Sequence, residues 1–139
     1  MAVNNALVLI SLLIFSNNVL GQNVSKNDIV GSWKVKRIVQ KPENPDFLPI
    51  LDGFSKATFE FHESQNFRFS TTSESKLFTE VIGMVDNTKW KYEPTKQLIK
   101  IGAEEDGFSI MGIYVSKEEG YLQFHIDESG LKFEMTQKK

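Results

Sequence analysis

The chain has 139 residues, of which 40% are hydrophobic and 24% charged, and it contains no cysteine. This length and composition are typical of a single soluble globular domain, and the lack of cysteine excludes a disulfide framework. The formal net charge is -2. Lysines and arginines are interspersed with acidic residues along the sequence, which argues against a nucleic-acid partner.

The first 21 residues have the pattern of a secretory signal peptide. An almost continuously apolar run extends from Ala6 to Phe15, and Val19-Leu20-Gly21 places small residues where signal peptidase cleaves. The apolar run has about half of the ~20 residues that a membrane-spanning helix needs. We therefore expect cleavage after Gly21, a secreted or periplasmic location, and a mature domain over residues 22–139 without a membrane anchor.

The mature domain begins with a short polar segment and then changes to strands. Ser25, followed three residues later by Asp28, predicts one capped helical turn. From Trp33 onward apolar and polar residues alternate, and turn-forming residues interrupt the alternation at regular intervals. Nine strands are expected, over residues 33–40, 56–63, 66–73, 76–85, 88–93, 96–103, 108–117, 120–127 and 131–137.

Short turns rich in Gly, Asn, Asp and Glu connect most of these strands, so we expect consecutive antiparallel hairpins. Every second residue along a strand is apolar, as for Phe59 and Phe61 or for Phe67 and Phe69. A sheet with one apolar face packs against a second sheet or closes on itself, and we favour closure because it removes the exposed edges. The predicted fold is all-β, a single antiparallel up-and-down barrel.

One long connection, residues 41–55, breaks this pattern. It contains three of the four prolines and is too apolar for a solvent-exposed linker. Two interpretations stay open. The favoured one is an irregular loop packed over one end of the core, and the other is a mobile lid that guards a ligand entrance.

The first strand opens with Ile29-Val30-Gly31-Ser32-Trp33-Lys34, which contains the pattern Gly-x-Trp. Gly31 allows the chain to enter closely beneath a barrel, and Trp33 can plug its closed end while the indole N–H finds a partner. This segment resembles the opening motif of the lipocalin and calycin superfamily. Gly31 and Trp33 are therefore the expected structural motif.

Later segments are similar to those of bacterial lipocalin-like domains, namely Thr58–Phe61, Lys89–Tyr92 and Leu98–Ile101. Such domains often carry a second Gly-x-Trp, where this chain has Thr88-Lys89-Trp90. The resemblance implies a barrel of about eight strands with a short N-terminal helical turn, so one of the nine runs is surplus or split. The interior of such a barrel holds side chains or one small ligand.

Candidate ligand-contacting residues are those expected to line the interior: Arg37, Phe59, Phe61, Phe67, Phe69, Glu80, Trp90, Tyr92 and Phe124. Strict alternation points Arg37 and Glu80 inward, and an interior arginine suggests a ligand with a carboxylate. For Arg37 we favour the alternative, a β-bulge that turns Ile38 inward and Arg37 outward. Tyr92 either orients a ligand or fills the core.

The sequence offers no recognisable catalytic or metal centre. The two histidines, His62 and His125, fall on the polar face of the strands, and zinc sites want three or four ligands with His or Cys among them. We find no nucleophile elbow and no phosphate-binding loop. We therefore expect a monomeric protein that is not an enzyme and has no metal or cofactor.

These observations predict an exported lipocalin-like binding protein that holds a small apolar or amphipathic ligand in the barrel. The alternative is a fully packed barrel that serves as a scaffold for a protein partner, for example as an inhibitor or an assembly factor. An enzyme that uses Arg37 and Glu80 is the least favoured interpretation.

Overall fold

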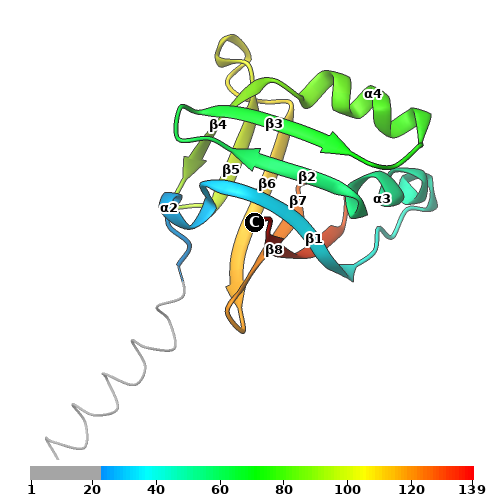
Figure 1. Ribbon diagram of the computed structural model, residues 1–139, viewed down its shortest axis with the longest axis horizontal. Helices are drawn as coiled ribbons and strands as arrows, with labels where there is room; N and C mark the ends of the chain where they lie inside the picture. Colours follow the sequence, from blue (N-terminus) through cyan, green and yellow to red (C-terminus); the bar gives the residue numbers. More distant parts are fainter. Residues whose placement is uncertain (1–22) are drawn as a thin grey trace, which may run out of the picture.

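Residues 23–139 are described by the structure, a computed structural model, and they form a closed barrel of antiparallel strands (Figure 1). The strands are β1 (Gly31–Gln40), β2 (Ala57–Phe61), β3 (Asn66–Thr71), β4 (Thr88–Glu93), β5 (Leu98–Gly102), β6 (Met111–Glu118), β7 (Tyr121–Ile126) and β8 (Leu131–Gln137). Each strand pairs with the next one in the sequence, and β8 pairs with β1. The predicted all-β, up-and-down barrel of eight strands is confirmed. The expected signal peptide, residues 1–21, lies outside the described residues.

Short helices connect several strands. They are α2 (Lys26–Ile29) before β1, η1 (Pro45–Phe47) and α3 (Leu48–Ser55) between β1 and β2, α4 (Lys76–Val85) between β3 and β4, and η2 (Glu104–Asp106) between β5 and β6. Within residues 23–139 we find no helix with the length and apolar character to cross a membrane.

Helix α2 is the capped turn that the sequence predicts. The Ser25 hydroxyl accepts a hydrogen bond from the Asp28 backbone N–H at 3.3 Å, and the Asp28 carboxylate accepts one from the Ser25 backbone N–H at 2.8 Å. Two of the backbone N–H groups at the start of the helix are thereby satisfied. This capping box fixes the position of the Asp28 side chain.

Helix α4 occupies the segment that alternation predicts as the fourth strand, so that prediction is wrong. Phe78 and Ile82 fit a period of two as well as a helical period, but Val81 and Val85 fit only the helix. The Ser75 hydroxyl caps the helix by accepting a hydrogen bond from the Phe78 N–H at 3.3 Å. The surplus segment among the nine predicted strands is therefore this fourth one, which forms a helix whose apolar face covers the barrel.

The connection between β1 and β2 is also more regular than expected. Its second half forms α3, so the prediction of an irregular loop is wrong there. Its packing over one end of the core is confirmed, because Phe54 is buried and its ring lies 5.8 Å from that of Phe133 and 6.0 Å from that of Phe69. The prolines fall in η1, in the first turn of α3 and in the preceding loop, where their missing N–H groups are tolerated.

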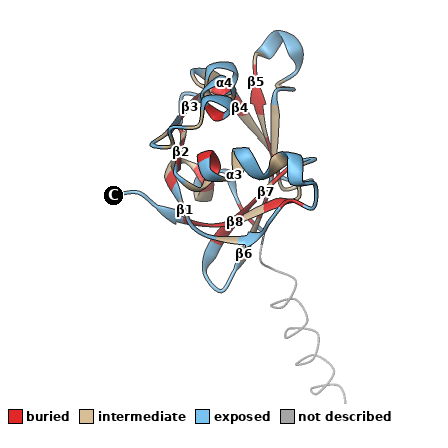
Figure 2. Ribbon diagram, turned by 90° about the vertical axis from the view of Figure 1, so that its right-hand side faces the viewer, coloured by how far each residue is buried: buried red, intermediate tan, exposed pale blue. Residues whose placement is uncertain are grey.

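Helices α3 and α4 together form what we call the cap, across one end of the barrel (Figure 2). Gly53 of α3 lies directly against the Phe78 ring of α4, and a Cβ atom at position 53 would overlap that ring. The Phe54 and Phe78 rings meet edge to face at 4.9 Å. The cap is therefore closely packed and apolar on its inner side.

The cap also closes a gap between two strands. β3 and β4 pair only through Asn66 with Lys89 and Phe67 with Thr88. Beyond them, the Asp86 carboxylate after α4 accepts a hydrogen bond from the Phe69 backbone N–H at 2.9 Å and one from Arg68 at 3.0 Å. Burial raises the pKa of Asp86, but these hydrogen bonds outweigh it and hold the pKa below its ordinary value.

Strand β1 contains the β-bulge that we favoured. Its register against β8 shifts between Val35 and Arg37, so that Lys36 and Arg37 both lie beside Glu134. Arg37 is exposed, with its Nε 3.4 Å from the Glu134 carboxylate, and Ile38 packs against the core. The inward orientation of Arg37 is therefore wrong.

Candidate functional site

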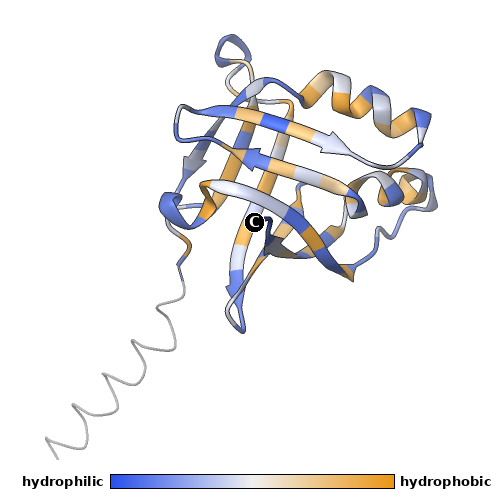
Figure 3. Cartoon of the chain, in the orientation of Figure 1, coloured by the Kyte–Doolittle hydropathy of each residue, from blue (hydrophilic) through white to orange (hydrophobic). Residues whose placement is uncertain are grey.

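The aromatic residues predicted to line the interior do point into the barrel. Each is at most 1% exposed: Phe59, Phe61, Phe67, Phe69, Trp90 and Phe124. The bands of alternating hydropathy along the strands reflect this arrangement (Figure 3). Their rings pack on one another, for example Phe59 on Phe69 at 4.8 Å and Phe61 on Trp90 at 5.3 Å. A ligand at this depth would have to displace rings that are in contact.

Glu80 and Tyr92 have different outcomes: Glu80 does not face the barrel interior, whereas Tyr92 packs against the core, which is one of the two expected roles. Glu80 is exposed on α4, so its inward orientation is wrong. The Tyr92 hydroxyl donates a hydrogen bond at 2.7 Å to the backbone carbonyl of Val24, which is itself buried. Burial, and to a smaller extent the charge of Asp28, raises the pKa of Tyr92. Tyr92 thus attaches the N-terminal segment to the barrel.

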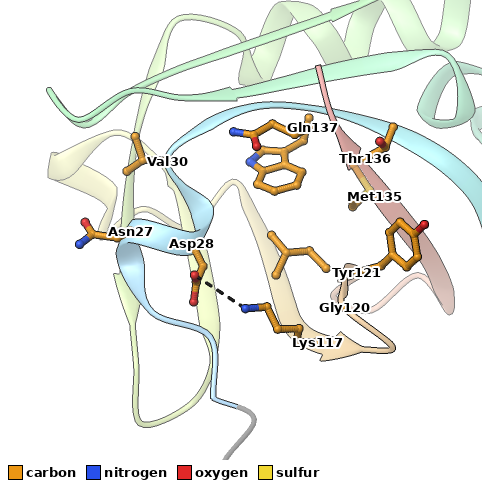
Figure 4. A pocket seen from close by; sticks show the side chains of 11 residues that line it. Asn27, Asp28, Val30, Lys117, Gly120, Tyr121, Met135, Thr136 and Gln137 are labelled. Atoms are coloured by element: carbon orange, nitrogen blue, oxygen red, sulfur yellow. Dashed lines mark ion pairs between the residues drawn. The ribbon is translucent and has the colours of Figure 1, made fainter. Parts of the chain in front are cut away.

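A pocket of about 410 Å³ lies at the end of the barrel where α2 is located, and we call it the α2-end pocket (Figure 4). Its volume falls in the range of small-molecule sites. Side chains from α2, β1, β8 and the β6–β7 hairpin line it: Asn27, Asp28, Val30, Trp33, Lys117, Gly120, Tyr121, Leu122, Met135, Thr136 and Gln137.

The floor of the α2-end pocket is apolar. Trp33, Leu122 and Met135 belong to the buried core, with exposed fractions of 9%, 4% and 1%. The Trp33 indole N–H donates to the Ile29 carbonyl at 2.7 Å, which confirms that it finds a partner at this end. Gly31 has φ +136°, a backbone conformation that other residues rarely adopt, so glycine is required there. The nearest atom to a Cβ at this position would be the terminal amide nitrogen of Gln137, at 2.9 Å.

The rim of the α2-end pocket carries two opposite charges. Asp28 Oδ1 and Lys117 Nζ are 3.8 Å apart, and their side chains are 36% and 38% exposed. The hydrogen bond from the Ser25 backbone N–H is the main reason why the pKa of Asp28 lies below its ordinary value. Asp28 is therefore ionised at neutral pH, and the rim presents a fixed carboxylate opposite an ammonium group.

Tyr121 forms a further part of the rim, and its ring is held from outside the pocket. Lys36 Nζ lies 3.7 Å from the centre of the Tyr121 ring, a cation–π contact that orients the phenol. Together with Asn27, Thr136 and Gln137, it adds neutral hydrogen-bonding groups to the rim. The pocket therefore combines an apolar floor with charged and neutral hydrogen-bonding groups at its rim.

A second pocket, of about 320 Å³, lies beside α4 at the other end of the barrel, and we call it the cap pocket. Apolar side chains dominate its lining, among them Val81, Met84, Ile110 and Met111. Met84 and Ile110 are 59% and 41% exposed. Asp127 and Glu128 contribute its charges, which are both negative.

A third hollow, of about 450 Å³, lies where β1 begins and β2 ends, and Glu60, His62 and Glu63 belong to its lining. His62 Nε2 is 3.7 Å from the Glu60 carboxylate, and both side chains are more than a third exposed. His62 and half-buried His125 both lie on the polar face of the strands, as predicted. Among the residues that line this hollow, Phe61 alone is fully buried.

Sequence reasoning missed most of the α2-end pocket. Trp33 was identified only as a structural residue, and Asp28 only as a helix cap. Lys117 carried a usable signal, because it follows Ile113 and Val115 on the inward side of β6 and is therefore a charge at an interior position. The approach of α2 to the β6–β7 hairpin depends on tertiary packing and left no pattern in the sequence.

Neither a family model, nor a curated protein, nor a solved structure matches this chain. The closed, eight-stranded, up-and-down topology is compatible with a calycin-like fold.

Proposed function

We propose that this protein is an exported, lipocalin-like binding protein that holds a small amphipathic molecule in the α2-end pocket. The observation that carries the proposal is the composition of that pocket, in which three buried apolar side chains lie beneath a charged and polar rim. Small-molecule sites combine apolar walls with a few placed polar groups, and the α2-end pocket has both, with polar side chains in the majority among its lining residues.

The position at the end of the barrel follows from the packing of the interior. The Phe61 ring lies between those of Phe67 and Trp90, at 5.0 and 5.3 Å from their centres. A ligand in the middle of the barrel would have to break such contacts, each of which stabilises the fold by about 0.5–1.5 kcal/mol beyond simple burial. The α2-end pocket needs no such displacement.

Two features of the sequence support the remaining parts of the proposal. The apolar run from Ala6 to Phe15 supports export, and the Gly-x-Trp motif at Gly31 and Trp33 supports a lipocalin-like origin. In this structure the motif tryptophan forms the floor of the candidate site.

The test is a fluorescence titration with 8-anilinonaphthalene-1-sulfonate, whose apolar rings match the floor and whose sulfonate matches Lys117. Two variants each place a tryptophan at the rim of one pocket: Asn27→Trp at the α2-end pocket and Met84→Trp at the cap pocket. Both positions are exposed, so both variants should fold. We expect Asn27→Trp to weaken dye binding by about tenfold or more, and Met84→Trp to leave it unchanged.

The opposite pattern, with weaker binding only in Met84→Trp, would move the ligand site to the cap pocket. Dye binding that neither variant weakens would overturn the proposed site. Folding of each variant is checked by its thermal unfolding midpoint.

A scaffold that binds a protein partner is the second candidate, and exposed apolar residues on and near the cap favour it. Leu48, Leu77, Met84 and Ile110 are each more than 40% exposed. Large exposed apolar residues that cluster often mark interaction surfaces. The combined variant Leu48→Gln, Leu77→Gln would abolish capture of a partner from the extract of the host under this function, while leaving dye binding intact.

A further inference from the structure

We propose that the α2-end pocket selects zwitterionic ligands, in which one ammonium and one carboxylate group are joined to a short apolar chain, as in an apolar α-amino acid. This inference rests on the proposed function and specifies the chemical class of its ligand. The geometry that points to it is the pair of opposite charges at one rim above an apolar floor (Figure 4).

Asp28 is a fixed acceptor with spare capacity. Its Oδ2 atom accepts hydrogen bonds from the Ser25 N–H at 2.8 Å and from the Ser25 hydroxyl at 3.0 Å. Its Oδ1 atom receives no hydrogen bond from the residues that the structure describes and faces Lys117. The carboxylate is thus oriented by its own helix cap, and the free oxygen can accept from a ligand ammonium group.

Lys117 supplies the matching donor. Its Nζ is 3.8 Å from Asp28 Oδ1, which is beyond hydrogen-bond distance, so the two charges attract each other without a direct hydrogen bond. Both side chains are more than a third exposed, and an ion pair of this kind contributes little to stability. A zwitterion gives each charge a hydrogen-bonding partner of opposite sign, whereas a ligand with one charge satisfies one group and is repelled by the other.

The apolar floor determines the chemical character of the uncharged part of the ligand. Trp33, Leu122 and Met135 are aromatic and aliphatic side chains that are largely buried, so the small apolar contact they leave at the floor suits a short, unbranched hydrocarbon chain. Burial of each methylene group contributes about 0.8 kcal/mol to binding. The floor alone would therefore bind any short apolar chain, and the rim decides between charge types.

Three probes with similar hydrocarbon chains isolate the effect of the rim. Norleucine carries both charges, hexanoate lacks the ammonium group, and pentylamine lacks the carboxylate. Dissociation constants are measured by amide-resolved NMR titration of the full chain. We expect norleucine to bind about tenfold more tightly than either of the other two.

Two variants test separately which rim residue binds each charged group of the ligand. Asp28→Asn should reduce the affinity for norleucine about tenfold and raise the affinity for hexanoate, because the repelling carboxylate is gone. Lys117→Met should reduce the affinity for norleucine similarly and raise that for pentylamine. Lys96→Met is the matched control, since Lys96 is an exposed lysine outside the pocket, and it should change none of the three affinities.

The outcomes separate this inference from the proposed function. If hexanoate or pentylamine binds the pocket as tightly as norleucine, the selectivity for zwitterions is overturned but the pocket remains a ligand site. If neither these probes nor the naphthalene dye binds, the proposed function fails together with the inference. A shift in affinities for Asp28→Asn and Lys117→Met in the opposite directions would also contradict the assignment of the charges.

Discussion

The two ends of the barrel are closed in different ways. At the cap end, two helices insert Phe54 and Phe78 into contact with each other and with the core. At the α2 end, a four-residue helix and an exposed ion pair border a pocket above Trp33. The same strands therefore support one end that is closed mainly by apolar packing and another end whose pocket is bordered by charged and polar groups.

The largest expected effect is at the cap. Phe78→Ala removes a fully buried ring and should lower the free energy of unfolding by about 3–5 kcal/mol. Urea denaturation measures this change in the free energy of unfolding. Dye binding by the folded fraction should keep the wild-type affinity, and a loss of affinity would show that the two ends are not independent.

The two glycines of the cap should respond in opposite directions to alanine. Gly53→Ala forces a methyl group against Phe78 and should cost about 1–3 kcal/mol of unfolding free energy. Gly83 has open space around it on α4, so Gly83→Ala should stabilise by about 0.5–1 kcal/mol through helix propensity. If both variants destabilise the protein equally, the close contact of α3 with α4 is wrong.

Asp86 gives the cap a pH dependence. Its pKa is lower in the folded than in the unfolded state, so its stabilisation is present at neutral pH and is lost as the pH falls through the folded pKa. At neutral pH, Asp86→Asn should lower the unfolding free energy by about 1–2 kcal/mol. Denaturation at a series of decreasing pH values should show this difference shrinking towards zero, and a constant difference would contradict it.

The smallest expected effect on stability is at the α2 end. Lys117→Met removes one partner of an exposed ion pair and should change the unfolding free energy by no more than about 0.5 kcal/mol. Its effect should instead fall on ligand affinity. A loss of stability comparable to that of Phe78→Ala would make the ion pair a structural element.

The barrel could be predicted from sequence because alternation and turn residues are local signals. The segment of α4 is ambiguous in a strand pattern because Phe78 and Ile82 satisfy both periods. Val81 and Val85 fit only the helical period, and the packing of Phe78 on Phe69 of the barrel agrees with the helix. The orientation of Arg37 depended on a bulge, whose presence is set by the partner strand β8. The α2-end pocket is lined by residues from opposite ends of the chain, and no local sequence pattern predicts that these residues lie close together.

The most direct test of the central claim is to map by NMR which backbone amides shift when the naphthalene dye is added to the full chain. Shifts concentrated at Asn27, Lys117 and Gln137 are the predicted result. Shifts concentrated at Val81, Met84 and Ile110 would place the ligand in the cap pocket, and shifts along Phe59 and Phe69 would place it among the core rings. Either of these two patterns would contradict the α2-end site.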